Sequence, residues 1–204
     1  MTNQASIAPL LSPAANPSVA RSLRGWLLPL FAFLSAEISA PAADDLRDRF
    51  GTRSMEAANL IQEGLQKMEA TRIQEAMKLF EKAGTVDPSC EFATYWIATA
   101  AGDLGDIDRS IQLFESIVES RAGRTPSSIT VDSAINLGIT HGQVGDDVKA
   151  TQWFSRAILL DPKDQFKLGY KAYRNMAIGF SRRNQPLSAA ICALNAFDAN
   201  PEMV

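Results

Sequence analysis

The residues that could do chemistry in this chain are few and far apart. Among 204 residues there is one histidine, His141, and there are two cysteines, Cys90 and Cys192. No cysteine or carboxylate cluster with the spacing of metal ligands accompanies His141, so we expect it to have a structural role. Asp146 and Asp147 of "GDDVK" offer too few oxygen ligands for a metal ion, but their carboxylates suit the start of a helix.

Sequence signatures of enzymes are missing as well. The sequence has no phosphate-binding P-loop, no dinucleotide fingerprint and no nucleophile elbow. We therefore expect a protein without catalytic activity, metal or cofactor. Two cysteines do not make a disulfide framework, and Cys192 is expected to be a small buried residue. An intermolecular bridge through Cys90 is left open.

Charge is distributed unevenly along the chain. Residues 56–120 contain twelve acidic and five basic residues, a balance of −7. Residues 163–184 contain six basic residues and one acidic residue, a balance of +5. The overall charge of −3 therefore conceals an early acidic part and a late basic part, and the late part is a candidate surface for an anionic group.

The elements that must position these residues are helices that repeat one spacing. "ATQWFSRAILLDP" places Ala150, Phe154 and Ala157 on one helical stripe, and Pro162 then ends the helix. Related segments start from small residues at positions 76, 110, 150 and 189, which are 34, 40 and 39 residues apart. Each segment follows another helical segment, such as "AINLGITHGQVG" before the third.

With this register the chain resembles the tetratricopeptide repeat (TPR) proteins. Their 34-residue unit is a helix–turn–helix with a bulky residue, Leu-Gly and Tyr in the first helix, then Ala-x3-Phe and Pro. Four units match, at about 57–90, 91–124, 131–164 and 170–203. The resemblance implies an all-α fold, a right-handed α-solenoid of antiparallel helix pairs over residues 57–204. We expect a loop in "VESRAGRTPSSIT", and we expect "KDQFK" to lengthen the helix that follows it.

The resemblance also implies a concave groove lined by the first helix of each unit. The lining positions, transferred to this chain, hold aromatic residues early and cations late, and Asp132 is among them. The expected partner-binding residues are Tyr95, Trp96, Thr99, Asn136, Lys171, Arg174, Asn175 and Arg182. This composition suits a protein or peptide with an apolar anchor and an acidic or C-terminal carboxylate end. Only Asn136 and Lys171 match the five-residue carboxylate clamp of some family members.

The first 42 residues have the composition of a targeting segment. Arg21 and Arg24 precede the apolar stretch "GWLLPLFAFL" at 25–34, and a small-residue cleavage site ends at Ala42. We expect an export signal or a transit segment at 1–42 and a linker or leading helix at 43–56. The expected location is the bacterial periplasm or the thylakoid or plastid lumen. If 25–34 is not removed, it would instead associate with a membrane.

These observations favour a protein-interaction scaffold that binds a partner in its groove and helps to assemble or maintain a complex. One alternative is a membrane-anchored accessory subunit. Another is a nucleic-acid-binding helical repeat protein that uses the basic last unit, although the acidic net charge and the export signal speak against nucleic acid. A third is a homo-oligomer whose solenoid ends stack, basic on acidic. The sequence leaves the oligomeric state, the cleavage of 1–42 and the identity of the partner open.

Overall fold

The computed structural model describes residues 43–202, so the predicted targeting segment at 1–42 lies outside the described residues. Within the described part the chain forms helices and no strand. The helices are α2 (Ala43–Phe50), α3 (Met55–Glu69), α4 (Ile73–Val86), α5 (Glu91–Asp103), α6 (Ile107–Ser120), α7 (Ser128–Gln143), α8 (Asp147–Leu160), α9 (Gly169–Arg182) and α10 (Pro186–Ala199).

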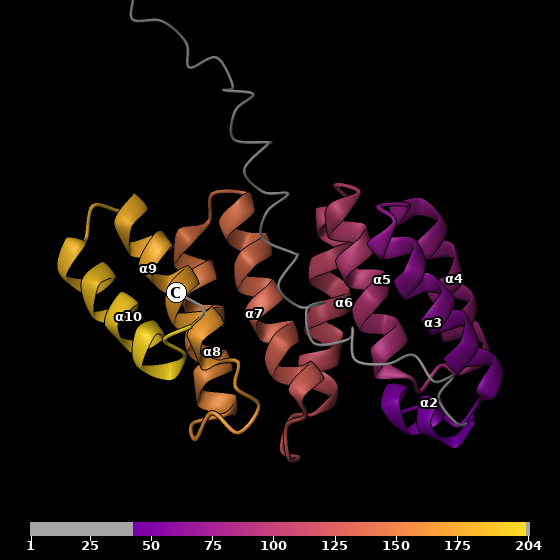
Figure 1. Cartoon of the computed structure of the whole chain (residues 1–204). Coiled ribbons are helices and arrows are strands. Elements are labelled where there is room, and N and C mark those ends of the chain that lie inside the picture. The colour runs from indigo at the N-terminus through magenta and orange to yellow at the C-terminus, as the bar shows by residue number, and fades with distance from the viewer. Residues whose placement is uncertain (1–42, 203–204) are drawn as a thin grey trace, which may run out of the picture. The chain divides into compact units, whose positions relative to one another are not determined.

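Helices α3 to α10 of this part follow one another along the stack, from indigo to yellow, and α2 packs against α3 at the first end (Figure 1). Four hairpins, α3–α4, α5–α6, α7–α8 and α9–α10, follow one another, and the second helix of each packs against the first helix of the next. First helices also contact each other, α5 with α7 and α7 with α9. This arrangement confirms the predicted all-α solenoid. None of the helices in 43–202 is long and apolar enough to cross a membrane.

The turns inside the hairpins are set by short polar signals. Asp106 and Asp146 accept hydrogen bonds from the backbone N–H groups three residues ahead and so cap α6 and α8. Gly105 and Gly145, directly before them, both have φ of +85°, a conformation that glycine adopts without strain. The "GD" pairs therefore end one helix and start the next.

Glycine and phenylalanine explain the repeated spacing within a hairpin. A Cβ atom added to Gly138 of α7 would lie 2.4 Å from the Phe154 ring of α8. A Cβ atom on Gly64 of α3 would lie 2.5 Å from the Phe80 ring of α4. Each ring thus lies directly on the backbone of the opposite helix, and the two helices approach as closely as that contact allows.

Two apolar cores meet at α5. The first core is formed by α2, α3, α4 and the start of α5, and contains Phe50, Ile61 and Phe80. The second runs from α5 to the start of α9 and contains Phe114 and Phe154. Trp96, in α5, packs against both cores.

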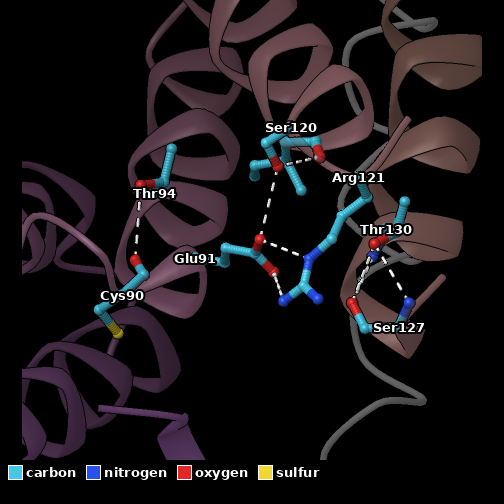
Figure 2. Close-up of polar contacts among 8 residues, drawn as sticks. Cys90, Glu91, Thr94, Ser120, Arg121, Ser127 and Thr130 are labelled. Atoms are coloured by element: carbon cyan, nitrogen blue, oxygen red, sulfur yellow. Dashed lines mark hydrogen bonds and ion pairs between the residues drawn. The ribbon is translucent and has the colours of Figure 1, made fainter. Parts of the chain in front are cut away.

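The predicted long loop is shorter than expected. Helix α6 continues to Ser120 and α7 begins at Ser128, because Ser127 and Thr130 form a capping box. Arg121 donates Nε and Nη2 hydrogen bonds of 2.7 and 2.9 Å to the Glu91 carboxylate at the start of α5, as Figure 2 shows. The connection 121–127 is therefore tied to the preceding hairpin at its first residue.

The prediction that "KDQFK" lengthens the next helix is wrong. Residues 161–168 form an irregular connection, and α9 begins only at Gly169. The Asp161 carboxylate accepts hydrogen bonds from the backbone N–H groups of Gln165 and Phe166 at 2.9 and 2.8 Å. The Asp164 carboxylate accepts one from Gly169 at 2.8 Å. These side chains stabilise a turn where a helix would otherwise start.

Candidate partner-binding site

A chain of polar side chains crosses three successive first helices. The Tyr95 hydroxyl of α5 donates a 2.6 Å hydrogen bond to Asp132 Oδ2 of α7. Lys171 Nζ of α9 donates to Asp132 Oδ1 at 3.2 Å. Asn136 Nδ2 of α7 donates to the Tyr95 hydroxyl at 3.0 Å. We call these four residues the Tyr95–Asp132–Lys171–Asn136 network.

The network is largely shielded from water. Tyr95 is 8% exposed, and the side chains of Lys171 and Asp132 are 19% and 15% exposed. Burial, and then the adjacent Asp132 carboxylate, raise the pKa of the Tyr95 phenol well above its usual value. Tyr95 therefore stays protonated and serves as a hydrogen-bond donor, while the Lys171 and Asp132 charges offset each other.

Next to the network lies a cluster of aromatic rings on α5. The Trp96 ring lies 5.5 Å from Tyr95 in an edge arrangement and 6.3 Å from Phe92, measured between centroids. It also stacks on Phe80 of α4 at 5.8 Å. Trp96 is half-buried, and its buried Nε1 has no hydrogen-bond partner in the described part of the chain. These rings give the first-helix side of the solenoid an apolar region beside a polar one.

The structure brings Tyr95, Trp96, Asn136 and Lys171 together, as the register implied. The remaining predicted residues are placed differently. Thr99 and Asn175 each bond a backbone carbonyl one turn earlier in their own helix, Tyr95 and Lys171 respectively. Arg174, partly buried, lies three residues after Lys171 on α9.

Arg182 lies outside the network. Its Nη1 donates hydrogen bonds to the Gly142 carbonyl at 3.0 Å and to Asp147 Oδ1 at 3.1 Å, where α7 turns into α8. Its side chain is 51% exposed. Arg182 thus ties the end of α9 to the preceding hairpin, a contact that the repeat register did not indicate.

Asp132 is the residue that sequence reasoning undervalued. It is one of the lining positions but not one of the expected binding residues, and the repeat register by itself leaves Lys171 as a cation open to a partner. A signal was present, because Asp132 and Lys171 occupy the same position of successive units, 39 residues apart. Equivalent positions of stacked repeats lie beside each other, so opposite charges there are expected to pair.

His141 and the acidic side chains are the other candidates for chemistry. Residues 43–202 contain no group of three His, Cys, Asp or Glu side chains that could hold a metal ion. His141 is 7% exposed, and burial followed by the Lys149 charge lowers its pKa. It borders an open hollow of about 510 Å³ on the second-helix side, together with Glu115 and Trp153. Nothing in this group pairs a nucleophile with a base.

Both cysteines are free and buried. Cys90 is 1% exposed at the start of α5, and its thiol donates to the Phe50 carbonyl at 3.4 Å. Cys192 is 6% exposed in α10. The burial of Cys90 disfavours the intermolecular disulfide that the sequence left open, because a second chain would have to displace α2 to reach its sulfur.

Comparisons with known proteins agree with this architecture. No family profile and no curated protein matches the sequence. A crystal structure of MamA is similar with a TM-score of 0.59 at 14% identity, covering 79% of this chain and 86% of that one. MamA residues 41 to the end, from Desulfovibrio magneticus RS-1, gives 0.58 at 15%, covering 79% and 85%.

A crystal structure of the APC/C hetero-tetramer Cut9-Hcn1 is also similar. It gives a TM-score of 0.58 at 20% identity over 77% of this chain and 27% of the matched one. Identities at this level establish a shared fold and nothing about a shared partner. Stacked helical hairpins and these likenesses together identify the fold of this chain as a TPR-like α-solenoid.

Proposed function

We propose that this protein is a non-enzymatic scaffold that binds a peptide or partner protein across its first helices α5, α7 and α9. The observation that carries the proposal is the Tyr95–Asp132–Lys171–Asn136 network, which fixes polar side chains of three successive repeats beside the Trp96 cluster. A preformed surface of this kind binds with little ordering cost. The TPR-like neighbours support a binding role over catalysis.

The partner that fits best has an apolar anchor and an acidic group. Trp96 and Phe92 are the surface for the anchor, since half-buried aromatic rings give the largest contact energies in interfaces. Asn136 commits one amide hydrogen to Tyr95, and Asn175 commits one to the Lys171 carbonyl, so each retains a second donor for a peptide backbone. The acidic or carboxylate end is drawn to the basic stretch around α9.

Asp132 determines how that acidic group binds. The Asp132 carboxylate already accepts a hydrogen bond from the Lys171 ammonium, so a carboxylate from a partner competes with Asp132 for the same donor. Asp132→Asn keeps an acceptor for Tyr95 and removes the competing charge. On this proposal it raises the affinity for an acidic peptide about tenfold, and Lys171→Met lowers it by a similar factor.

The experiment uses the full chain as bait for a random-peptide library displayed with free carboxyl ends. Enriched sequences are expected to combine an aromatic or large aliphatic residue with an acidic terminus. One enriched peptide, labelled with a fluorophore, is then titrated against the two variants and against Lys149→Met. Lys149 is a matched control, because it also pairs with an acid, Asp146 at 3.7 Å, but on α8. Equal effects of Lys149→Met and Lys171→Met would refute the assigned surface, and no enrichment would refute peptide binding.

We further propose that the protein is exported and helps to assemble or maintain a complex in an envelope or lumen. The support is the composition of residues 1–42, with basic residues before the apolar stretch at 25–34. N-terminal sequencing of the native protein after cell fractionation tests this. A mature start near Ala43 in an exported fraction is expected, and an intact Met1 in a cytosolic fraction would contradict export.

A further inference from the structure

Helix α10 exposes an apolar face that none of the other helices in residues 43–202 has. Four large side chains of α10 are open to water: Leu187 at 75%, Ile191 at 50%, Leu194 at 64% and Phe197 at 52%. They follow one another by four, three and three residues, so they lie along one side of the helix. In α10 only Cys192 and Ala196 are buried.

At the first three of these four positions the earlier repeats are polar except at Val148, whereas the position of Phe197 holds Gly84, Val118 and Ile158. We compare equivalent positions of the four second helices, counted from the small residue at 76, 110, 150 or 189. The positions are two before, two after and five after that residue. They hold Gln74, Lys78 and Glu81 in α4; Asp108, Gln112 and Glu115 in α6; Val148, Gln152 and Ser155 in α8; and Leu187, Ile191 and Leu194 in α10. The lack of a further repeat after α10 in residues 43–202 does not explain these leucines and the isoleucine, because the same three positions of the earlier repeats are polar except at Val148 even though a next repeat is present.

The opposite end of the described stack is built differently. The exposed side chains along α3 are Glu56, Asn59, Glu63, Gln66 and Glu69, which also follow a helical spacing. A polar outer face is what keeps the end of a solenoid soluble. Stacking α10 of one copy onto α3 of another would bury these carboxylates against apolar side chains, so a head-to-tail filament is disfavoured.

We propose that α10 is a dimerisation helix whose apolar face packs against α10 of a second copy of this chain, antiparallel about a two-fold axis. The face is self-complementary, as such an axis requires. Residues 186–202 contain no lysine or arginine and two acids, Asp198 and Glu202. Antiparallel packing brings these acids beside the positive N-terminal end of the partner copy's α10 and beside the end of its α9, where Arg182 also pairs with Asp147 and Arg183 also donates to Thr151. A parallel pair would place like charges together at both ends.

The proposed dimer interface is separate from the first-helix site, so dimerisation and peptide binding can be refuted independently. One helix pair offers less area than the roughly 1,600 Å² of a standard interface, and we therefore expect a dissociation constant in the micromolar range. Sedimentation equilibrium of the full chain between about 1 and 200 μM tests it, and the expected result is a monomer–dimer equilibrium. A monomer throughout that range would overturn the proposal, whether α10 is then bare or covered by another segment or protein.

Leu187→Glu is the decisive variant, and Val148→Glu is its matched control. Each is the second residue of its helix, α10 or α8, and each is exposed, at 75% and 55%, so neither change should prevent folding. Because the two-fold axis repeats the change, Leu187→Glu should raise the dimer dissociation constant about a hundredfold or more. Val148→Glu should leave it unchanged. Dimers that survive Leu187→Glu, or that are lost equally in both variants, would contradict an interface on α10.

The antiparallel arrangement has its own test in the folded full chain. Leu187→Cys and Phe197→Cys proteins are mixed and oxidised, since the native thiols are buried. Disulfides between the two different variants should exceed those between two copies of either one. A preference for like pairs would show a parallel arrangement and overturn the antiparallel one.

Discussion

Replacing Gly138 by alanine tests whether the glycine–phenylalanine contact sets the spacing of a hairpin. The new Cβ atom would lie 2.4, 2.6 and 2.8 Å from three carbon atoms of the Phe154 ring. The ring is 3% exposed and has packed neighbours on its other sides. It has to withdraw by about 1 Å to reach a tolerable distance, and the α7–α8 hairpin must open to allow this.

The magnitude follows from two opposing terms. Overpacking a filled core costs about 1–3 kcal/mol, and a clash with a rigid buried ring belongs at the upper end of that range. Alanine in place of glycine inside a helix returns about 1 kcal/mol. The expected net loss of unfolding free energy is therefore about 2 kcal/mol. Gly142→Ala in the same helix is the control, because its Cβ would meet only the Ala150 side chain at 3.7 Å, and it should stabilise by about 0.5–1 kcal/mol.

Urea unfolding followed by circular dichroism at 222 nm measures the difference. With a denaturant dependence of about 2 kcal/mol per molar, the midpoints of the two variants should differ by roughly 1.5 M. Adding Phe154→Leu should reduce the cost of Gly138→Ala, since a flexible side chain can move aside. The steric explanation is refuted if the Gly138→Ala protein is as stable as the Gly142→Ala protein. It is also refuted if Gly138→Ala lowers the unfolding free energy by the same amount with leucine at 154 as with phenylalanine.

Three further outcomes are expected. Hydrogen bonds from the Ser89 hydroxyl and then from Thr52 lower the pKa of Asp87 from 3.8 to about 2. The stability that these hydrogen bonds provide is complete above pH 3.8 and is lost as the pH falls towards 2. Asp87→Asn should therefore make the unfolding free energy depend less on pH in the acid range and lower it by on the order of 1 kcal/mol at pH 7. An unchanged pH dependence in the acid range would contradict this. Tyr95→Phe, which leaves Asp132 short of one donor, should lower the unfolding free energy by about 1–2 kcal/mol in urea titrations, and no change would mean that solvent replaces the bond. Burial raises the pKa of the Cys90 and Cys192 thiols, so both should react with a disulfide reagent far more slowly in native protein than in urea, and a rapid native reaction at Cys90 would contradict its burial under α2.

The fold was predictable because local and repeated signals agree. Small residues four positions before an aromatic residue, as in Ala150 and Phe154, occur in three of the units and specify close helix pairs, and the four copies of the helix-pair register specify stacking. The capping role of Asp146 was also predictable, because an N-cap depends on residues within one turn. The turn at 161–168 was not predictable from the sequence, since a short polar segment can form either a helix or a turn. The hydrogen bonds that the Asp161 side chain accepts from the backbone decide for the turn.

The sequence predicts which helices carry the residues of the candidate site, but it does not predict which of these side chains pair with each other. The repeat register brought Tyr95, Asn136 and Lys171 to one region, which needs only that equivalent positions align. Whether Lys171 meets Asp132 or solvent depends on the separation of α7 and α9, and that separation is a property of the stack. The contact of Arg182 with the α7–α8 turn depends on it in the same way.

Trp96 gives the molecule one more property. Repeat arrays hold together through nearest neighbours, so the cooperativity with which this array unfolds depends on the contacts at α5, where its two apolar cores meet. Trp96 touches both cores, and the same ring lies beside the proposed peptide. A ligand that binds this indole would therefore stabilise the contact between the two cores, and its binding would couple their unfolding.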